Sequence, residues 1–193
     1  MTAILGDGKI KGSVLLSRLE FIKEHGGEQV LAQVLDKLDA EDRRVLTGMV
    51  LPVTWYDIHL ELRLDRAMAT VISPKDPNRL FLDFGRTSAE KNLAQYQSDF
   101  IEAGNPHRVL SFAPQLYRLY YDAGRRTYEK LGERRAVLRT FDAKTVTAED
   151  CLTVVGWHER AIELSGGRNV RVKEPHCRTN GHPHCEYECE WSV

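Results

Sequence analysis

Apolar residues recur at intervals of three and four through the first half of the chain, as in helices that bury one face. Gly26 and Gly27 interrupt the first run, and Pro52 and Pro74 bound a later one. The spacing predicts amphipathic helices over 13–25, 28–38 and 53–72, the third beginning close to Trp55, and a fourth that ends at Ala103.

The start of the fourth helix is open between two positions. Its apolar stripe extends back to Asn78, but Gly85 interrupts the stripe. Thr87, followed three residues later by Glu90, is a capping-box signal for a later start. Residues 39–51 fit neither a helical nor a strand pattern clearly.

The second half combines helical patterns with the period-two alternation of strands. From Pro114 a helical pattern reaches Gly124, and Thr147, with Asp150 in the capping-box position, opens a helix that runs to Leu164. Alternating residues predict strands over 127–130, 134–141, 169–176 and 185–191. These elements indicate an α+β fold in which N-terminal helices pack on a small antiparallel sheet.

Composition and charge are those of an ordinary globular protein. The 193 residues carry 27 Lys and Arg against 28 Asp and Glu, which argues against a nucleic-acid partner. The N-terminus lacks a secretion signal, and no window approaches the ~18 consecutive apolar residues of a membrane span. We therefore expect a cytoplasmic protein with one domain over 1–193, in which 1–50 form a helical extension.

All four cysteines lie near the C-terminus, at Cys151, Cys177, Cys185 and Cys189. Alternation over 185–191 places Cys185 and Cys189 on the buried face of a strand and the intervening glutamates on a solvated face. The strand separates these two thiols, so we expect one of them to be a core residue only. The Asn180-Gly181 turn brings Cys177 toward Cys185, as a disulfide or as half of a metal site, and a reducing compartment favours metal.

The pattern Cys151-x22-Glu174-x2-Cys177-x7-Cys185, with Gly156-Trp157 and Gly181, resembles the zinc-bearing C-terminal part of the phenol-responsive sensor domains of NtrC-type activators. Their superfamily includes 4-vinyl-reductase-type domains, TRAPP vesicle-tethering subunits and, more distantly, haem-NO-binding domains. The segments LLSRLEFIKEH, GRTSAE and LYRLYYDAGR also resemble a largely myxobacterial family of this superfamily.

This resemblance implies a closed, structural Zn²⁺ site that pins a helix to the terminal hairpin. Its four ligands would be Cys151, Glu174, Cys177 and Cys185, which leaves Cys189 as the core thiol. The resemblance also implies that residues 107–193 form the sensor-like α+β portion of the domain.

Several alternatives to this ligand set are open. The thiols would be buried core residues beside an exposed Glu174, or Cys177 and Cys185 would form a disulfide. His158, on the helix face of Cys151, is another ligand candidate. Three imidazoles near the turn could also replace the carboxylate: His176, His182 and His184.

Sensors of this superfamily hold an apolar or aromatic compound in a pocket beside the sheet, which implies such a ligand here. The candidate lining residues are His107, Phe112, Tyr117, Tyr120, Tyr121 and Trp157, with Trp55 and Tyr56 as further aromatics. As an alternative, these side chains belong to the ordinary core. The His and Trp that orient phenol in those sensors have no match, and the Tyr-x-Ser-x-Arg motif that holds haem propionates is absent. We therefore expect neither phenol specificity nor haem.

Two arginine pairs, Arg125-Arg126 and Arg134-Arg135, flank the predicted hairpin over 127–141. Guanidinium forks match phosphate, so a phosphate-bearing ligand or nucleotide is one interpretation. The other is a solvated hairpin, which this charge pattern favours.

The sequence favours a non-enzymatic, zinc-stabilised sensor or signalling adaptor that forms a homodimer. It has no P-loop, no dinucleotide fingerprint, no H-E-x-x-H motif and no serine nucleophile elbow. A ligand that prefers one arrangement of the helices would change the surface offered to a partner. Because the chain ends soon after its last strand, we expect output through a separate partner protein. The alternative is a structural interaction scaffold of TRAPP-subunit type with no ligand.

Overall fold

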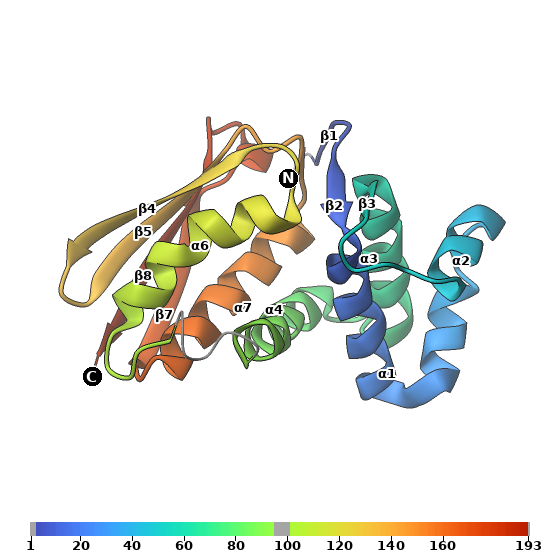
Figure 1. Cartoon of the computed structure of the whole chain (residues 1–193), viewed down its shortest axis with the longest axis horizontal. Helices are drawn as coiled ribbons and strands as arrows, with labels where there is room; N and C mark the ends of the chain where they lie inside the picture. The colour runs from blue at the N-terminus through green and yellow to red at the C-terminus, as the bar shows by residue number, and fades with distance from the viewer. Residues whose placement is uncertain (1–2, 95–100, 193) are drawn as a thin grey trace.

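The C-terminal half of the chain builds a four-stranded antiparallel sheet with the order β4-β5-β8-β7 (Figure 1). The computed structural model describes residues 3–94 and 101–192. In this sheet Leu138 of β5 pairs with Tyr128 of β4, and Val172 of β7 pairs with Cys189 of β8, so both predicted hairpins are confirmed. The strands are β4 (Arg125–Gly132), β5 (Arg135–Phe141), β7 (Arg168–His176) and β8 (Cys185–Ser192).

Two helices, α6 (Pro106–Tyr120) and α7 (Ala148–Leu164), cover one face of this sheet (Figure 1). α7 begins as predicted, because the Thr147 side chain accepts a hydrogen bond from Asp150 N at 3.1 Å. α6 begins earlier than predicted and continues through Pro114. Pro106 occupies the first turn, where no N–H donor is needed, and so it starts the helix rather than ending the preceding one.

The N-terminal helices pack on one another and on α4, whereas α6 and α7 are the helices that lie on the sheet (Figure 1). The predicted packing of the N-terminal helices on the sheet is therefore wrong. Their apolar faces close a core cluster of their own that runs from Ile10 to Phe84. The helices are α1 (Gly12–Leu35), α2 (Ala40–Thr47), α3 (Ile58–Ile72) and α4 (Pro77–Ala94).

The predicted break between the first two helices is confirmed. Gly26 and Gly27 have non-helical backbone angles within α1, and Gly27 has a φ of 70°. The unassigned stretch 39–51 contains α2, whose first turn is capped by Asp39, which accepts a hydrogen bond from Asp42 N at 2.8 Å. Among the described helices, none is long and apolar enough to cross a membrane.

A strand occupies the predicted start of the third helix. β3 (Trp55–Asp57) pairs antiparallel with β2 (Lys9–Lys11), and α3 begins only at Ile58. The Asp57 carboxylate caps α3 by accepting a hydrogen bond from His59 N at 3.0 Å. A second small pair joins β1 (Ile4–Leu5) to β6 (Thr145–Val146).

α4 passes straight through Gly85, so a start at Thr87 is wrong. Gly85 lies where α4 crosses α7, and a Cβ at this position would stand 2.1 Å from the carbonyl oxygen of Thr153. From the other helix, a Cβ at Gly156 would stand 2.1 Å from the carbonyl oxygen of Leu82. The two glycines therefore serve a backbone-to-backbone contact and do not end a helix.

The predicted end of the fourth helix falls partly outside the described residues. The described part of α4 ends at Ala94, and residues 95–100 are not described. Ala103 lies in a turn and not in a helix.

We expect Gly156→Ala to lower the free energy of unfolding by about 2 kcal/mol or more, although alanine itself favours helices. The added methyl group must push α7 away from the backbone of α4. Chemical denaturation measures the change. Gly132→Ala is the control, because nothing lies within 4 Å of a Cβ at that position. A Gly156→Ala protein as stable as the wild type would contradict the close crossing.

Candidate metal centre and ligand cavity

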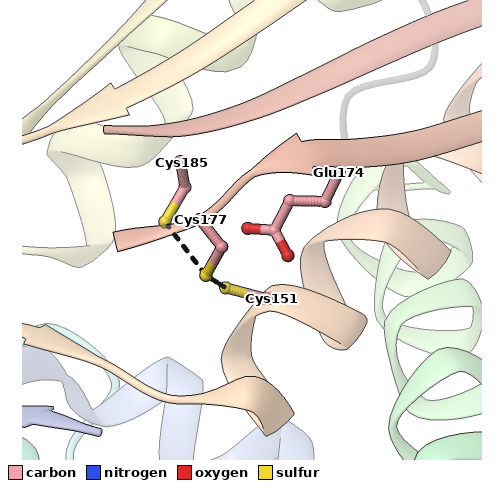
Figure 2. A group of neighbouring side chains, drawn as sticks. All are labelled: Cys151, Glu174, Cys177 and Cys185. Carbon is pink, nitrogen blue, oxygen red and sulfur yellow. Dashed lines mark hydrogen bonds between the residues drawn. The ribbon is translucent and has the colours of Figure 1, made fainter. Parts of the chain in front are cut away.

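Four side chains converge between the sheet and α7, and they point toward one another (Figure 2). They are Cys151 in the first turn of α7, Glu174 on β7, Cys177 just after β7 and Cys185 at the start of β8. Between the last two, the chain reverses through the short helix η1 (Arg178–Asn180) and Gly181. Gly181 has a φ of 86°, the left-handed conformation predicted for the Asn-Gly turn.

The sulfur spacing matches that of a tetrahedral thiolate site. Cys177 Sγ lies 3.6 Å from Cys151 Sγ and 3.9 Å from Cys185 Sγ. Metal–sulfur bonds of about 2.3 Å in a tetrahedron place the sulfurs about 3.8 Å apart. Each of the four side chains offers a donor atom, and these atoms lie within 4.8 Å of one another. The donors are therefore close enough to share one thiophilic metal ion.

Four acidic groups at these distances cannot all ionise without a cation. Hydrogen bonds from Cys151 and Cys185 lower the pKa of Cys177, and the hydrogen bond to Cys177 raises the pKa of Cys151. Burial raises the pKa of Glu174 to about 7. Glu174 Oε1 is buried and has no hydrogen-bond partner among the described residues. A bound cation would satisfy this oxygen and stabilise the ionised thiols.

Polar groups of the turn surround two of the sulfurs. Arg178 N donates a hydrogen bond to Cys185 Sγ at 3.5 Å, and Thr179 Oγ1 lies 2.9 Å from Cys177 Sγ. Such contacts orient metal ligands and support the charge on a thiolate.

The structure does not support two roles that the sequence left open, a disulfide and a ligand role for His158. All four cysteines are free thiols, so the proposed Cys177–Cys185 disulfide is not formed. Cys189 is a core thiol, as predicted, between Ala136 and Val172 on the neighbouring strands. His158 is also fully buried, and neither of its ring nitrogens has a hydrogen-bond partner in the described part of the chain.

Two of the three turn histidines lie beside Glu186 rather than beside the sulfurs, and the third, His182, packs against His176 with ring centroids 4.6 Å apart. His176 Nδ1 lies 3.2 Å from Glu186 Oε1, and His184 Nε2 lies 3.6 Å from Glu186 Oε2. Arg139 also pairs with this carboxylate. Glu186 was predicted to be solvated, but it is only 8% exposed because β8 lies inside the sheet and these side chains cover it.

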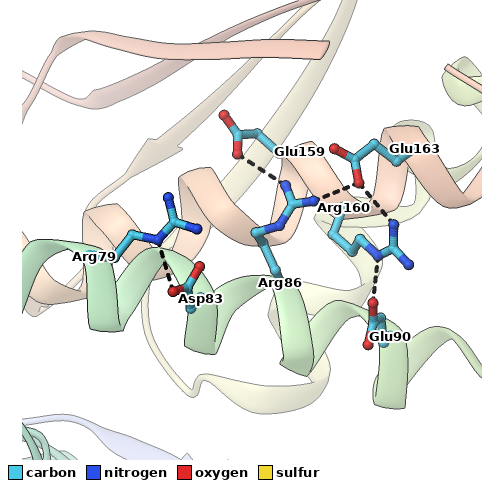
Figure 3. Close-up of polar contacts among 7 residues, drawn as sticks. All are labelled: Arg79, Asp83, Arg86, Glu90, Glu159, Arg160 and Glu163. Carbon is cyan, nitrogen blue, oxygen red and sulfur yellow. Dashed lines mark hydrogen bonds and ion pairs between the residues drawn. The ribbon is translucent and has the colours of Figure 1, made fainter. Parts of the chain in front are cut away.

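Charged side chains hold α7, and with it Cys151, against α4 (Figure 3). Arg86 Nη2 lies 2.7 Å from Glu163 Oε2, and Arg160 Nε lies 2.7 Å from Glu90 Oε1. Arg160 also pairs with Glu163, which joins these contacts into one network. Such partly exposed pairs contribute modestly one by one. Together with the glycine crossing, they define the position of α7.

A cavity of about 170 Å³ lies where the N-terminal helices meet α6, α7 and the sheet. Its lining combines aromatic and aliphatic side chains with a few polar groups, and Cys151 and Cys185 reach it from the thiol cluster. An apolar cavity of about 150 Å³ suffices to bind benzene. The cavity therefore has room for one small ring compound next to the candidate metal centre.

Four of the six predicted pocket residues line this cavity: Tyr117, Tyr120, Tyr121 and Trp157. His107 lies elsewhere, with Nδ1 2.7 Å from Tyr128 Oη and Nε2 2.9 Å from the carbonyl oxygen of Glu133. Phe112 also lies elsewhere and packs under the guanidinium of Arg108. The cavity face of α6 carries Tyr117 and Tyr120, and His107 and Phe112 lie on other sides of the helix.

The two further aromatics also lie outside the cavity lining. Trp55 stacks under Lys11 Nζ, which is 3.9 Å from its ring centroid. Tyr56 Oη accepts a hydrogen bond from Leu51 N at 2.9 Å. Both side chains therefore stabilise the loop before α3.

A buried ion cluster that the sequence patterns did not predict borders the cavity. Arg18 Nε donates to Asp65 Oδ1 at 2.7 Å, and its Nη2 donates to Asp65 Oδ2 at 3.0 Å and pairs with Glu61. All three residues are at most 3% exposed. Burial raises the pKa of Glu61 to about 8, which Arg18 opposes in part. Glu61 and Asp65 are four residues apart on the apolar face of α3, which was the available signal.

The predicted arginine pairs do not form phosphate-binding forks. Arg125 pairs with Asp142 at 3.7 Å, and Arg135 pairs with Glu190 at 3.1 Å. Arg126 faces inward and lines the cavity. Because alternate residues of a strand face opposite sides, the two members of a pair separate.

No family model and no curated protein matches the sequence. Solved H-NOX structures share its fold. The H-NOX protein from S. oneidensis in the Fe(II)NO state has a TM-score of 0.74 at 12% identity, over 95% of this chain and 99% of that chain. An unliganded Fe(II) H-NOX variant from K. algicida has a TM-score of 0.71 at 10% identity, over 95% and 97%. A structure concerned with haem redox potential and porphyrin distortion has a TM-score of 0.69 at 11% identity, over 93% and 99%.

These comparisons correct two predictions. The structural neighbours are H-NOX domains, so the resemblance to 4-vinyl-reductase-type domains, phenol sensors and TRAPP subunits is wrong. The prediction of zinc as the cofactor, which rested on that resemblance, is also wrong. The structural neighbours are reported with iron and haem. A short spacing between cysteines indicates a local turn, and the same turn can occur in unrelated folds. The spacing alone therefore does not identify the fold.

The residues around the cavity do not fit haem. Histidine, a common axial ligand of haem iron, is absent from the described residues that line the cavity. The sulfurs of Cys151 and Cys185 face Cys177 and Glu174 in the cluster (Figure 2). A cavity of about 170 Å³ holds one small ring, whereas haem contains four pyrrole rings. We therefore assign this chain no haem chemistry.

We expect the free energy of unfolding to fall as the pH rises from about 5 to 8, in part through Glu61. This carboxyl keeps its proton to about pH 8 in the folded chain, against 4.5 as its ordinary value. The folded state therefore binds more protons in this range, and stability decreases with pH. Glu61→Gln should reduce the loss by on the order of a few kcal/mol.

Urea denaturation between pH 5 and 8 tests the role of Glu61, within the range of about two to three pH units that its shift affects. Glu41→Gln, at an exposed position of α2, should leave the pH dependence unchanged. Equal slopes for the wild type and Glu61→Gln would contradict the raised pKa of this buried carboxyl group.

Proposed function

We propose that the chain is a non-enzymatic sensor that binds a small apolar or aromatic compound in the cavity between its helices and its sheet. The observation that carries this proposal is the cavity itself, with its tyrosines, Trp157 and a small number of polar groups. Ligand sites are typically concave, mostly apolar and bordered by a few such groups. The H-NOX fold supports our prediction that the chain is not an enzyme.

We further propose that Cys151, Glu174, Cys177 and Cys185 bind a thiophilic metal ion that stabilises the C-terminal hairpin. The sulfur spacing, the partnerless Glu174 oxygen and the closed set of four protein donors support this role. Four protein ligands leave no open position for substrate, so the ion would be structural.

Signalling would pass through the helices that border the cavity. A ligand that binds one arrangement of α1, α3 and α7 more tightly would shift the population toward it and change the outer surface. We propose a single domain over 1–193 that acts as a homodimer on a partner protein. The open cavity favours this function over a ligand-free scaffold.

The protein purified under reducing conditions should contain one thiophilic metal ion per chain by elemental analysis. Cys177→Ser should lose most of the metal and several kcal/mol of stability, because metal binding contributes directly to folding. Cys189→Ser is the matched control on the same hairpin, since Cys189 lies in the core away from the cluster. If the wild-type protein contains no metal, or if the two variants contain equal amounts of metal, the proposed metal centre is wrong.

Toluene or indole should bind the wild-type protein, as measured by ligand-observed NMR. Val154→Phe should weaken this binding at least about tenfold by filling the cavity. Val155→Phe adds the same volume at the next position, which does not line the cavity, and should leave binding intact. If neither compound binds the wild type, or if both variants behave alike, the cavity is not the ligand site.

A further inference from the structure

Arg126 distinguishes the cavity from a purely apolar one. It enters from β4, and its guanidinium lies 5.1 Å from the ring centroid of Tyr117 and 5.8 Å from that of Tyr187. Its Nε donates a hydrogen bond to Thr140 Oγ1 at 3.0 Å. These contacts orient the side chain and place its charge over two aromatic faces. Thr140 uses only one of the five N–H donors of the guanidinium.

The positive charge of Arg126 is not matched by a resident carboxylate. Among the described residues, no ion pair to Arg126 lies within 4.0 Å. Nearby arginines on β4 and β5 do form ion pairs. Arg125 pairs with Asp142, and Arg139 pairs with Glu129 and Glu186. A partly buried cation that lines a cavity without an anion is a natural partner for an anionic ligand.

The other charged end of the cavity contains Arg18 together with the carboxyl groups of Glu61, Asp65 and Asp150. Arg18 holds two hydrogen bonds to Asp65 and an ion pair to Glu61, so its donors are engaged. Glu61, with a pKa of about 8, retains its proton near neutral pH. An incoming anion therefore meets an unpaired guanidinium only at the β4 end of the cavity.

We propose that the ligand of this cavity is a small aromatic monocarboxylate whose carboxylate is bound by the guanidinium of Arg126. This inference rests on the proposed ligand-binding function and adds the chemical class of the ligand. The volume limits the body of the ligand to about one ring. The terminal nitrogens of a guanidinium match a carboxylate with two parallel hydrogen bonds, which adds orientation to affinity. Tyr117 and Tyr187 would contact the ring or the carbon next to the carboxylate.

Benzoate and benzamide test this proposal, because they have nearly the same shape and differ in charge. Isothermal titration should show that the wild-type protein binds benzoate at least about tenfold more tightly than benzamide. Arg126→Gln should lose this preference and still bind benzamide. Arg125→Gln is the matched control on the same strand, where the side chain faces outward to Asp142, and it should keep the preference.

Other outcomes separate the two proposals. If benzamide or toluene binds the wild type and benzoate binds no better, the role of Arg126 is refuted while the cavity remains a ligand site. If none of the three compounds binds, the proposed function itself fails. If Arg126→Gln loses metal together with benzoate binding, the guanidinium compensates the charge of the thiol cluster, and the carboxylate assignment is wrong.

Discussion

The backbone contact between α4 and α7 at Gly85 and Gly156 determines where the groups of both candidate sites lie. α7 brings Cys151 to the thiol cluster from its first turn and Trp157 to the cavity from its middle. A tetrahedral site tolerates errors of only about 0.5 Å in its ligands. A methyl group between the helices would have to push α7, and with it Cys151, away from α4. Close helix packing is therefore a requirement of the proposed metal centre as well as of the core.

The structure balances its two buried groups of charges in different ways. In the first group Arg18 pairs with Asp65 and contacts Glu61, which retains its proton near neutral pH, and the Asp150 carboxyl lies within 4.8 Å of both acids. Three thiols and Glu174 form a set with no resident cation among the described residues within reach of the orphaned Glu174 oxygen. The second group would gain stability from the proposed ion, because a cation would allow the thiols and Glu174 to ionise together.

Local signals in the sequence were reliable where one element decides the outcome. The Thr147 cap, the left-handed Gly181 and both hairpins follow from side-chain hydrogen bonding and alternation within a few residues. The approach of Cys177 to Cys185 followed from their spacing around a short turn, whereas Cys151 and Glu174 entered the predicted set only through the resemblance. Long-range packing gave no such signal. Gly85 has the composition of a helix stop, and only the approach of α7 from a distant part of the chain explains its place within α4.

The cofactor could not be inferred from kinship, whether to phenol sensors or to H-NOX proteins, because a fold does not specify the chemistry of its interior. The chain has the architecture of H-NOX structures at 10–12% overall sequence identity. Tyr117, Tyr121 and Trp157 fill space around a cavity of about 170 Å³, which is too small for a porphyrin. Side-chain volume and the placement of charge, rather than the path of the backbone, therefore decide which ligand this version of the fold can hold.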